Sequence, residues 1–324
     1  MAKATNIQEA LALSIADERA VEFAKQVWRS DYRGCTPEQR DEVAVAHEST
    51  LAQLHATVHD PAALERTVRR ILTELFRHDE PNHWLRAFHD HDRRPLLFAR
   101  QFQMIAPYLR GERLLDVGCG AGHLAQRCAD RGYRVDTTDV MDYRIDGASE
   151  LPFRRMDEPT RIPFAEDDAD TALLFAVLHH VDSEHLGPLL SDVHRVASRV
   201  IVREDVYDIP LHEPSAQRAG RRDPLLREFV TLAPEEQKRV LVLLDYFDNV
   251  LKRGIPEMNL PMQFKPMREW RRILERHGFE HVDTVLIGFD RGEQRTGTCH
   301  ALLVFDAPPV GQGPPRPIAS TATR

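Results

Sequence analysis

The residues best suited to chemistry begin with three glycines at alternate positions, Gly118, Gly120 and Gly122, which directly follow the apolar run 114–117. Glycine lets the backbone turn sharply and lets a ligand approach the main chain closely. The helix expected to follow would present free N–H groups at its first turn. The pattern predicts a ligand-binding loop between a strand and a helix. A tight turn with a purely structural role is the alternative.

Acidic residues follow the next two expected strands. Asp139 ends the run 133–139, 23 positions after Asp116, and Asp157 follows the short run 152–156. In a doubly wound sheet, an acidic residue at the end of the second strand lies beside the first loop, where it can accept hydrogen bonds from a ribose diol. We therefore expect Asp139 to face the ligand held by the glycine loop.

Two histidines and a carboxylate end the following strands. His179 and His180 follow the apolar run 171–178 and should lie at the ligand-binding edge of the sheet. Neutral imidazole can accept a proton at physiological pH, so either ring could act as a general base. Alternation along a strand would send the two rings to opposite faces, with one of them among the helices. Glu204 could orient an amine or accept a proton; pairing with Arg203 or simple solvation is the alternative.

The elements that position these residues alternate between strand and helix from residue 113 onward, which predicts a parallel, doubly wound sheet. The expected strands are 113–117, 133–139, 152–156, 171–178, 200–204, 281–289 and 299–305, and the expected helices are 122–131, 183–197 and 267–277.

The remaining segments read as helices and loops. Apolar residues recur at three- and four-residue steps in 10–28, and Thr36-Pro37 and Asp60-Pro61 are typical helix starts. A further helix is expected over 95–108. We expect an all-helical N-terminal cap (1–110), a core (111–306) with a helical insert (209–266), and a disordered tail (307–324). Within the insert, the segment Asp245-Tyr246-Phe247-Asp248-Asn249 mixes polar tips with apolar bodies, as a small-molecule pocket requires.

The glycine loop in L-D-V-G-C-G-A-G, the acidic ends of the next two strands and L-H-H after the fourth occur here in the order typical of class I S-adenosylmethionine-dependent methyltransferases, which the chain resembles over about 113–305. The resemblance implies a Rossmann-like, seven-stranded sheet of order 3-2-1-4-5-7-6, with the last strand antiparallel. It also implies S-adenosylmethionine as cofactor and methyl transfer to a small molecule, such as a specialised metabolite.

The resemblance also assigns residues. The loop would pass beneath the methionine part of the cofactor, Asp139 would hold the ribose, and Asp157 would bond the adenine amino group. The cofactor-binding set it implies is Asp116, Gly118, Cys119, Gly120, Gly122, Asp139, Val140, Asp157, Glu158, Phe175 and Ala176. The catalytic candidates are His180, taken as the nearer to the acceptor, with His179 and Glu204. Only 18 positions separate Asp139 from Asp157, so the helix between them should be short or irregular.

Composition limits the kinds of partner that we expect the protein to bind. The net charge of −8 argues against a nucleic-acid substrate, and no apolar run is long enough to span a membrane. Four cysteines without a metal-type pattern predict reduced thiols in a cytoplasmic protein, and the chain could also form a homodimer.

Two further histidine groups have spacings that metal ligands can use. They are His55 with His59, and His83, His89 and His91 with Asp90 and Asp92. No cysteine- or carboxylate-rich partner completes the first group, which reads better as a solvated helix face, and the second is equally unsupported. We therefore predict no metal site.

Two other functions remain to be weighed against methyl transfer. One is a protein that binds S-adenosylmethionine without transferring its methyl group. The other is an NAD(P) oxidoreductase, which is disfavoured because a G-x-G-x-x-G motif would need glycine where the chain has His123.

Overall fold

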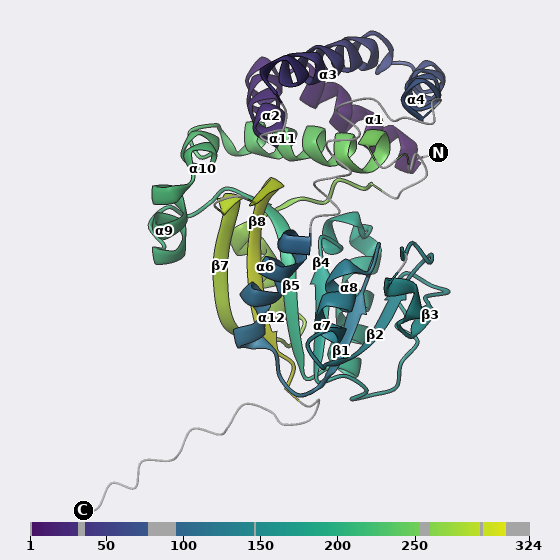
Figure 1. Ribbon diagram of the computed structural model, residues 1–324, viewed down its shortest axis with the longest axis vertical. Helices are drawn as coiled ribbons and strands as arrows, with labels where there is room; N and C mark the ends of the chain where they lie inside the picture. Colours follow the sequence, from purple (N-terminus) through teal and green to yellow (C-terminus); the bar gives the residue numbers. More distant parts are fainter. Residues whose placement is uncertain are drawn as a thin grey trace, which may run out of the picture.

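A mixed sheet forms the centre of the protein (Figure 1). The structure is a computed structural model that describes residues 2–31, 36–76, 95–145, 147–252, 254, 260–291 and 294–308. Its strands are β1 (Arg113–Val117), β2 (Arg134–Asp139), β3 (Phe153–Arg155), β4 (Thr171–Phe175), β5 (Arg199–Tyr207), β6 (Lys265–Pro266), β7 (Glu280–Arg291) and β8 (Gln294–Asp306).

The strand order is β3-β2-β1-β4-β5-β8-β7, and the two-residue β6 pairs with β5 off this path. Strands β1 to β5 run parallel, whereas β8 is antiparallel to both β5 and β7. With β6 set aside, the predicted order 3-2-1-4-5-7-6 is confirmed. The central strands β1 and β4 are buried almost throughout, as expected of a parallel sheet covered on both faces.

Helices cover both faces of the sheet. On one face, α6 (Pro95–Ile105) and α7 (His123–Ala129) pack through Phe102, Ile105 and Leu124 onto Leu114 and Leu173. The other face is covered by α8 (Ser183–Val196) and α12 (Met267–Arg276), whose apolar residues share a core with the sheet. Helix α6 falls within the segment expected to form the cap, yet it packs on the sheet.

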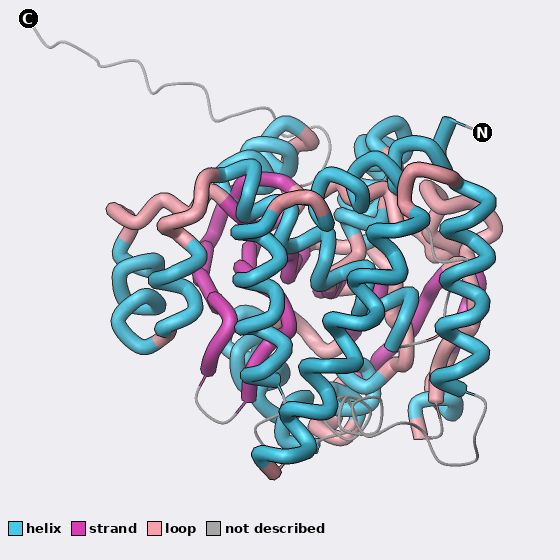
Figure 2. The backbone as a smooth tube through the Cα atoms, turned by 90° about the horizontal axis from the view of Figure 1, so that it is seen from above, coloured by secondary structure: helices cyan, strands magenta, loops and turns pink. Residues whose placement is uncertain are grey.

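The N-terminal helices lie across the carboxyl edge of the sheet (Figures 1 and 2). They are α1 (Ala2–Ile15), α2 (Glu18–Asp31), α3 (Pro37–Thr57) and α4 (Pro61–Phe76). Asp17 separates α1 from α2 within the single helical run expected over 10–28, because its Oδ1 accepts hydrogen bonds from the amides of Arg19 and Ala20.

The insert supplies a fifth helix to this layer. Helix α11 (Pro234–Tyr246) continues as a π-helix over Phe247–Lys252 and packs against α1 and α2. Two ion pairs join the N-terminal helices to α11: Arg19 pairs with Glu236 at 2.9 Å, and Asp17 pairs with Arg239 at 2.6 Å. The shorter helices α9 (Pro214–Arg222) and α10 (Pro224–Phe229) pack beside β7. We call α1–α4 together with α11 the helical layer.

Three further expectations concern the link after β2, the C-terminal tail and membrane-spanning helices. Among the described residues of the link between Asp139 and Asp157, the structure has β3 and one 3-10 turn, Ala148–Glu150, so the expected short or irregular connection is confirmed there. Most of the expected tail, 309–324, lies outside the described residues. In the part of the chain that the structure describes, no helix combines the length and apolar character needed to cross a bilayer.

Asp170 fixes the entrance to β1. Its Oδ2 accepts hydrogen bonds from the amides of Glu112 and Arg113, both at 2.9 Å, and its Oδ1 accepts one from Arg113 Nη2 at 2.7 Å. Gly111 has φ +61°, and a Cβ there would lie 2.1 Å from Asp170 Oδ2. The hydrogen bond from Arg113 lowers the pKa of Asp170, although burial opposes this shift.

We expect Asp170→Ala to lower the free energy of unfolding by about 1–3 kcal/mol, since two backbone donors and a guanidinium lose their acceptor. Because the folded-state pKa is lowered, the carboxylate stabilises the protein above a pH of about 4, and this contribution is lost as the pH falls. Urea denaturation at pH 7 and at acidic pH measures both effects. Asp130→Ala, at an exposed turn, is the control, and an equal loss in both variants would contradict the assignment.

Candidate functional site

The glycine loop joins β1 to α7, and its three glycines all have positive φ, between +50° and +75°. A Cβ at Gly118 would lie 2.6 Å from Val177, and one at Gly122 would lie 2.6 Å from Ala148. At Gly120, by contrast, no atom lies within 4 Å of an added Cβ. Two glycines are therefore required by close packing, and the third leaves an open cradle beside the main chain. This geometry fits a ligand lying against the loop.

Two carboxylates flank this cradle. Asp139 Oδ2 accepts a hydrogen bond from the Gly120 amide at 2.9 Å, and Oδ1 accepts one from Val140 at 2.7 Å. Burial raises the pKa of Asp139, and burial together with the charge of Asp139 raises the pKa of Asp116 to about 7. A carboxylate has about four lone-pair positions, so Asp139 keeps acceptor capacity for a ligand. Cys119 completes the loop and donates its amide to Thr138 at 3.2 Å.

The segment beyond Asp139 is held by a side chain instead of a helix. Arg144 donates to the carbonyl of Leu151, pairs with Asp142 at 2.8 Å and lies over the ring of Phe153 at 4.6 Å. After β3, Met156 is buried and donates its amide to the Asp139 carbonyl at 2.9 Å. The predicted ligands Val140, Asp157 and Glu158 are exposed at the same edge of the sheet.

Strand β4 ends at Phe175, earlier than the predicted 171–178, and the expected alternation of the two histidines is wrong. Ala176 has φ +57°, which leaves the β region, and Leu178–His180 form a 3-10 turn. As a result the rings of His179 and His180 lie side by side, with centroids 4.1 Å apart.

Glu204, on the neighbouring strand β5, stabilises this turn through hydrogen bonds. Its side chain is fully buried, Oε1 accepts hydrogen bonds from the amides of Val177 at 3.0 Å and Leu178 at 2.7 Å, and Oε2 lies 2.6 Å from His179 Nδ1. It is therefore neither a solvated carboxylate nor a partner of Arg203. Glu204 fixes the orientation of His179 and is shielded from any ligand by the turn it supports.

Asp245, on α11, completes the cluster from the opposite side. Its side chain is buried, and Oδ1 accepts a hydrogen bond from Asn249 at 2.7 Å. The same oxygen lies 3.6 Å from His179 Nε2 and 3.8 Å from His180 Nε2. The sequence placed Asp245 in an expected pocket segment but gave it no role, because nothing in the sequence says that α11 crosses the end of β4. We call His179, His180 and Asp245 the edge cluster.

The pKa values of the two rings shift in opposite directions. Burial disfavours a charged His179, yet the charge of Glu204 and contacts with Asp245 raise its pKa well above the ordinary value. Burial and the neighbouring charge of His179 lower the pKa of His180 to about 4, so this ring is neutral at pH 7. Phe264 stacks on His179 at 5.0 Å, and 21% of the His180 side chain is exposed. His180 is thus the ring that a ligand can approach.

A second buried polar network lies next to the edge cluster. His300 Nε2 lies 2.8 Å from Asp205 Oδ1, and Thr298 donates to the same oxygen at 2.7 Å. Arg203 contacts His300 at 2.7 Å and lies 5.9 Å from the ring of Phe175. The end of β5 therefore carries two further charged groups, Arg203 and Asp205, both in contact with His300.

Other sequence candidates are not brought to this site. His55 is exposed on α3 and His59 is exposed beyond the end of that helix. The histidine and aspartate group at 83–92 lies outside the described residues.

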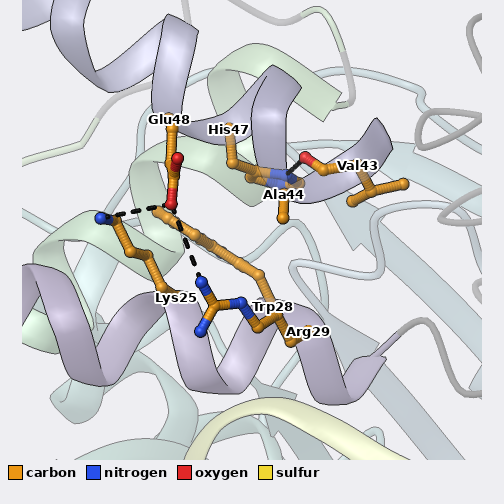
Figure 3. Close-up of a pocket in the computed structure, with 7 residues that line it drawn as sticks. All are labelled: Lys25, Trp28, Arg29, Val43, Ala44, His47 and Glu48. Carbon is orange, nitrogen blue, oxygen red and sulfur yellow. Dashed lines mark hydrogen bonds and ion pairs between the residues drawn. The ribbon is translucent and has the colours of Figure 1, made fainter. Parts of the chain in front are cut away.

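A hollow between α2 and α3 is a separate feature of the helical layer (Figure 3). Glu48 pairs with Lys25 at 3.5 Å and Arg29 at 3.7 Å, while the rings of Trp28 and His47 stack at 4.7 Å. Its charges are paired with one another and its rings are packed together. The hollow is therefore explained by packing between the two helices.

Comparisons with known proteins identify the segment around the glycine loop. Residues 115–200, from β1 to the start of β5, match the family model described as "Methyltransferase domain". No curated protein matches the chain.

Among solved structures, an S-adenosylmethionine-dependent methyltransferase from Methanosarcina mazei is similar at 16% identity and a TM-score of 0.42, covering 63% of this chain and 96% of that one. Geranyl diphosphate C-methyltransferase from Streptomyces coelicolor gives 14% identity and a TM-score of 0.44, covering 72% and 87%. A possible histamine N-methyltransferase from Thermotoga maritima gives 14% and 0.44, covering 69% and 98%.

The family match falls on the elements that build the glycine cradle and the histidine turn, within a sheet whose order agrees with the sequence-based expectation. Residues 115–200 of this chain therefore carry a methyltransferase domain of the family that this model describes.

Proposed function

We propose that this methyltransferase acts on a small-molecule acceptor, such as a specialised metabolite, bound between the turn after β4 and helix α11. The observation that carries the proposal is the edge cluster, in which two histidine rings and a carboxylate from the helical layer meet at the carboxyl end of β4. A buried polar cluster covered by helices suits a compact acceptor better than a polymer. The net charge of −8 gives no electrostatic attraction for the phosphate backbone of a nucleic acid.

The residues of the glycine cradle fit the cofactor. The open side of Gly120 can accept the methionine part, and the remaining lone pairs of Asp139 can accept the ribose hydroxyls. The full proposed set, from the loop to the end of β4, is Asp116, Gly118, Cys119, Gly120, Gly122, Asp139, Val140, Asp157, Glu158, Phe175 and Ala176.

S-adenosylmethionine, when bound, supplies a methyl group that is already activated by the positive sulfur. The chain therefore has to hold the acceptor atom in line with that methyl group, and such positioning can contribute up to about 7–11 kcal/mol. Val177 packs on Gly118, so the turn that carries the histidines directly adjoins the cradle. This contact supports an acceptor position within reach of both.

Four residues divide the roles at the acceptor. His180, the more accessible ring, is proposed to contact the acceptor at its reacting atom. His179 is proposed to orient the acceptor together with Asp245, while Glu204 positions His179 through the hydrogen bond at Nδ1.

The helical layer is proposed to act as a cover over the acceptor. The helical layer combines the N-terminal helices with α11 of the insert, and α11 brings Asp245 to the edge cluster. Excluding water at this edge would protect the reacting geometry and strengthen the polar contacts made there.

Incubation of the full chain with S-adenosylmethionine and extracts of the native host, followed by untargeted mass spectrometry, tests the function. We expect acceptors to gain about 14 Da, with stoichiometric S-adenosylhomocysteine. Binding of S-adenosylmethionine without either product would instead favour a non-methylating role. Preferential NADH binding would favour the oxidoreductase alternative.

We expect Asp139→Ala to raise the Kd for S-adenosylhomocysteine at least tenfold, because each charge-assisted hydrogen bond contributes about 1.5–3 kcal/mol before solvent compensation. Isothermal titration calorimetry measures the Kd, and circular dichroism checks the fold. Asp136→Ala on the same strand is the control and should retain the wild-type Kd. An unchanged Kd in Asp139→Ala would show that the ribose lies elsewhere.

His180→Ala should lower kcat by about 10²-fold or more, the range typical of a group that handles the reacting proton, and should leave the affinity for S-adenosylhomocysteine nearly intact. His185→Ala removes a more exposed histidine of α8 and should retain wild-type kcat. Wild-type kcat in His180→Ala would remove this ring from the acceptor site.

A further inference from the structure

We propose that the edge cluster is a binding site for one divalent transition-metal ion, held by His179, His180 and Asp245. The sequence alone does not indicate this site, because the third ligand lies on α11, 65 positions beyond His180. The structure brings one ligand atom from each residue within 4.8 Å of the other two, the arrangement that a single ion requires.

The spacing fits a small ion after a slight inward movement. Ligand atoms about 2.0–2.2 Å from a tetrahedral Zn²⁺ lie about 3.3–3.6 Å from one another. Asp245 Oδ1 is 3.6 Å from His179 Nε2 and 3.8 Å from His180 Nε2. These distances are too long for good hydrogen bonds but only slightly longer than ligand–ligand separations around a metal.

Two polar atoms of the cluster point to a ligand. His179 Nε2 and Asp245 Oδ2 are buried, and within the described residues neither makes a hydrogen bond. The side chains of His179 and Asp245 are only 1% and 6% exposed. Buried polar atoms are normally satisfied, and an ion at Asp245 Oδ1 accounts for His179 Nε2 directly. It also accounts for Asp245 Oδ2 when the carboxylate binds the ion through both oxygens.

The surroundings match the usual support of a histidine–carboxylate metal site. Glu204 lies 2.6 Å from His179 Nδ1, the carboxylate–histidine contact that fixes which ring nitrogen faces a metal. Asn249 donates to Asp245 Oδ1 and orients that carboxylate. Two of the three ligand residues, His179 and Asp245, therefore have an outer partner that holds them in place.

The donor set selects the class of ion. Two imidazole nitrogens and one carboxylate oxygen favour Zn²⁺, Fe²⁺, Co²⁺ or Mn²⁺ over Mg²⁺, which prefers oxygen ligands. Three protein ligands leave at least one position open, as in catalytic zinc sites.

The open position would suit an acceptor hydroxyl, a reading that rests on the proposed function. The metal would favour loss of the hydroxyl proton to solvent water. The oxygen lone pair would then form the O–C bond as the C–S bond breaks, leaving its electron pair on sulfur. The products are a methyl ether and S-adenosylhomocysteine, and the metal is neither oxidised nor reduced.

The test uses the full-length, untagged protein, freed of metal with a chelator and titrated with Zn²⁺ by calorimetry and with Co²⁺ by visible absorption. We expect one ion per chain, with Mg²⁺ binding much more weakly. His180→Gln and Asp245→Asn should each weaken Zn²⁺ binding by at least about 100-fold, and Asn249→Ala by about 10–100-fold.

The matched control is the double variant His55→Gln/His59→Gln, which removes two exposed histidines and should retain the site. Circular dichroism and S-adenosylhomocysteine binding verify that each variant is folded, and Zn²⁺ should raise the Tm of the wild type but not that of Asp245→Asn. If the control variant abolishes binding, or if the cluster variants leave it unchanged, the ion is held elsewhere and the proposal fails.

The two proposals can fail separately. If no metal binds stoichiometrically and methyl transfer stays intact after chelation, the metal site alone is overturned. A protonated His179 would then bridge Glu204 and Asp245. Stoichiometric metal binding without methylated products would leave the site in place and overturn the proposed function.

Discussion

The arrangement of the site depends on one buried carboxylate. Glu204 is completely removed from solvent, and a carboxylate in that position is unfavourable unless hydrogen bonds replace its hydration. Two backbone amides and one imidazole supply them, all from the consecutive residues Val177, Leu178 and His179. These bonds offset the burial of Glu204 and also hold the chain in a turn that would otherwise continue as a strand. The direction of the His179 ring follows from these bonds, and the ring of His180, the next residue of the turn, lies beside it.

The parts of this fold that were predictable from sequence are those governed by local patterns. The glycine loop and the irregular link before Asp157 appear as expected, because glycine spacing and the short separation between Asp139 and Asp157 express local backbone requirements. The strand order also agrees with the expectation, but that expectation came from the family resemblance and not from local patterns. The end of β4 was not predictable, since it depends on a left-handed Ala176, a conformation that alanine rarely adopts. What favours it is the hydrogen-bonding demand of Glu204 on the neighbouring strand.

Tertiary placement explains the other differences. Helix α6 is contiguous with the N-terminal helices in sequence, but Phe102 and Ile105 find their apolar partners on the sheet. In the sequence, Asp245 looks like an ordinary polar residue of an amphipathic helix. Its contact with the histidines is visible only once α11 is placed at the edge of the sheet. Sequence periodicity tells which face of a helix is apolar, whereas it does not tell which other element that face will meet. The edge cluster could therefore be recognised only in three dimensions.

The origin of the helical layer has a consequence for how the chain folds. Helices α1–α4 end at Phe76, and α11, against which α1 and α2 pack, begins about 160 residues later. During synthesis from the N-terminus, their apolar residues, among them Leu11, Phe23 and Trp28, lack this partner until most of the sheet has left the ribosome. The layer is thus a late product of folding, dominated by contacts between distant parts of the sequence, and such contacts form slowly because a long loop must close first. The acceptor site, which needs Asp245 from that layer, is among the last parts of the protein to be assembled.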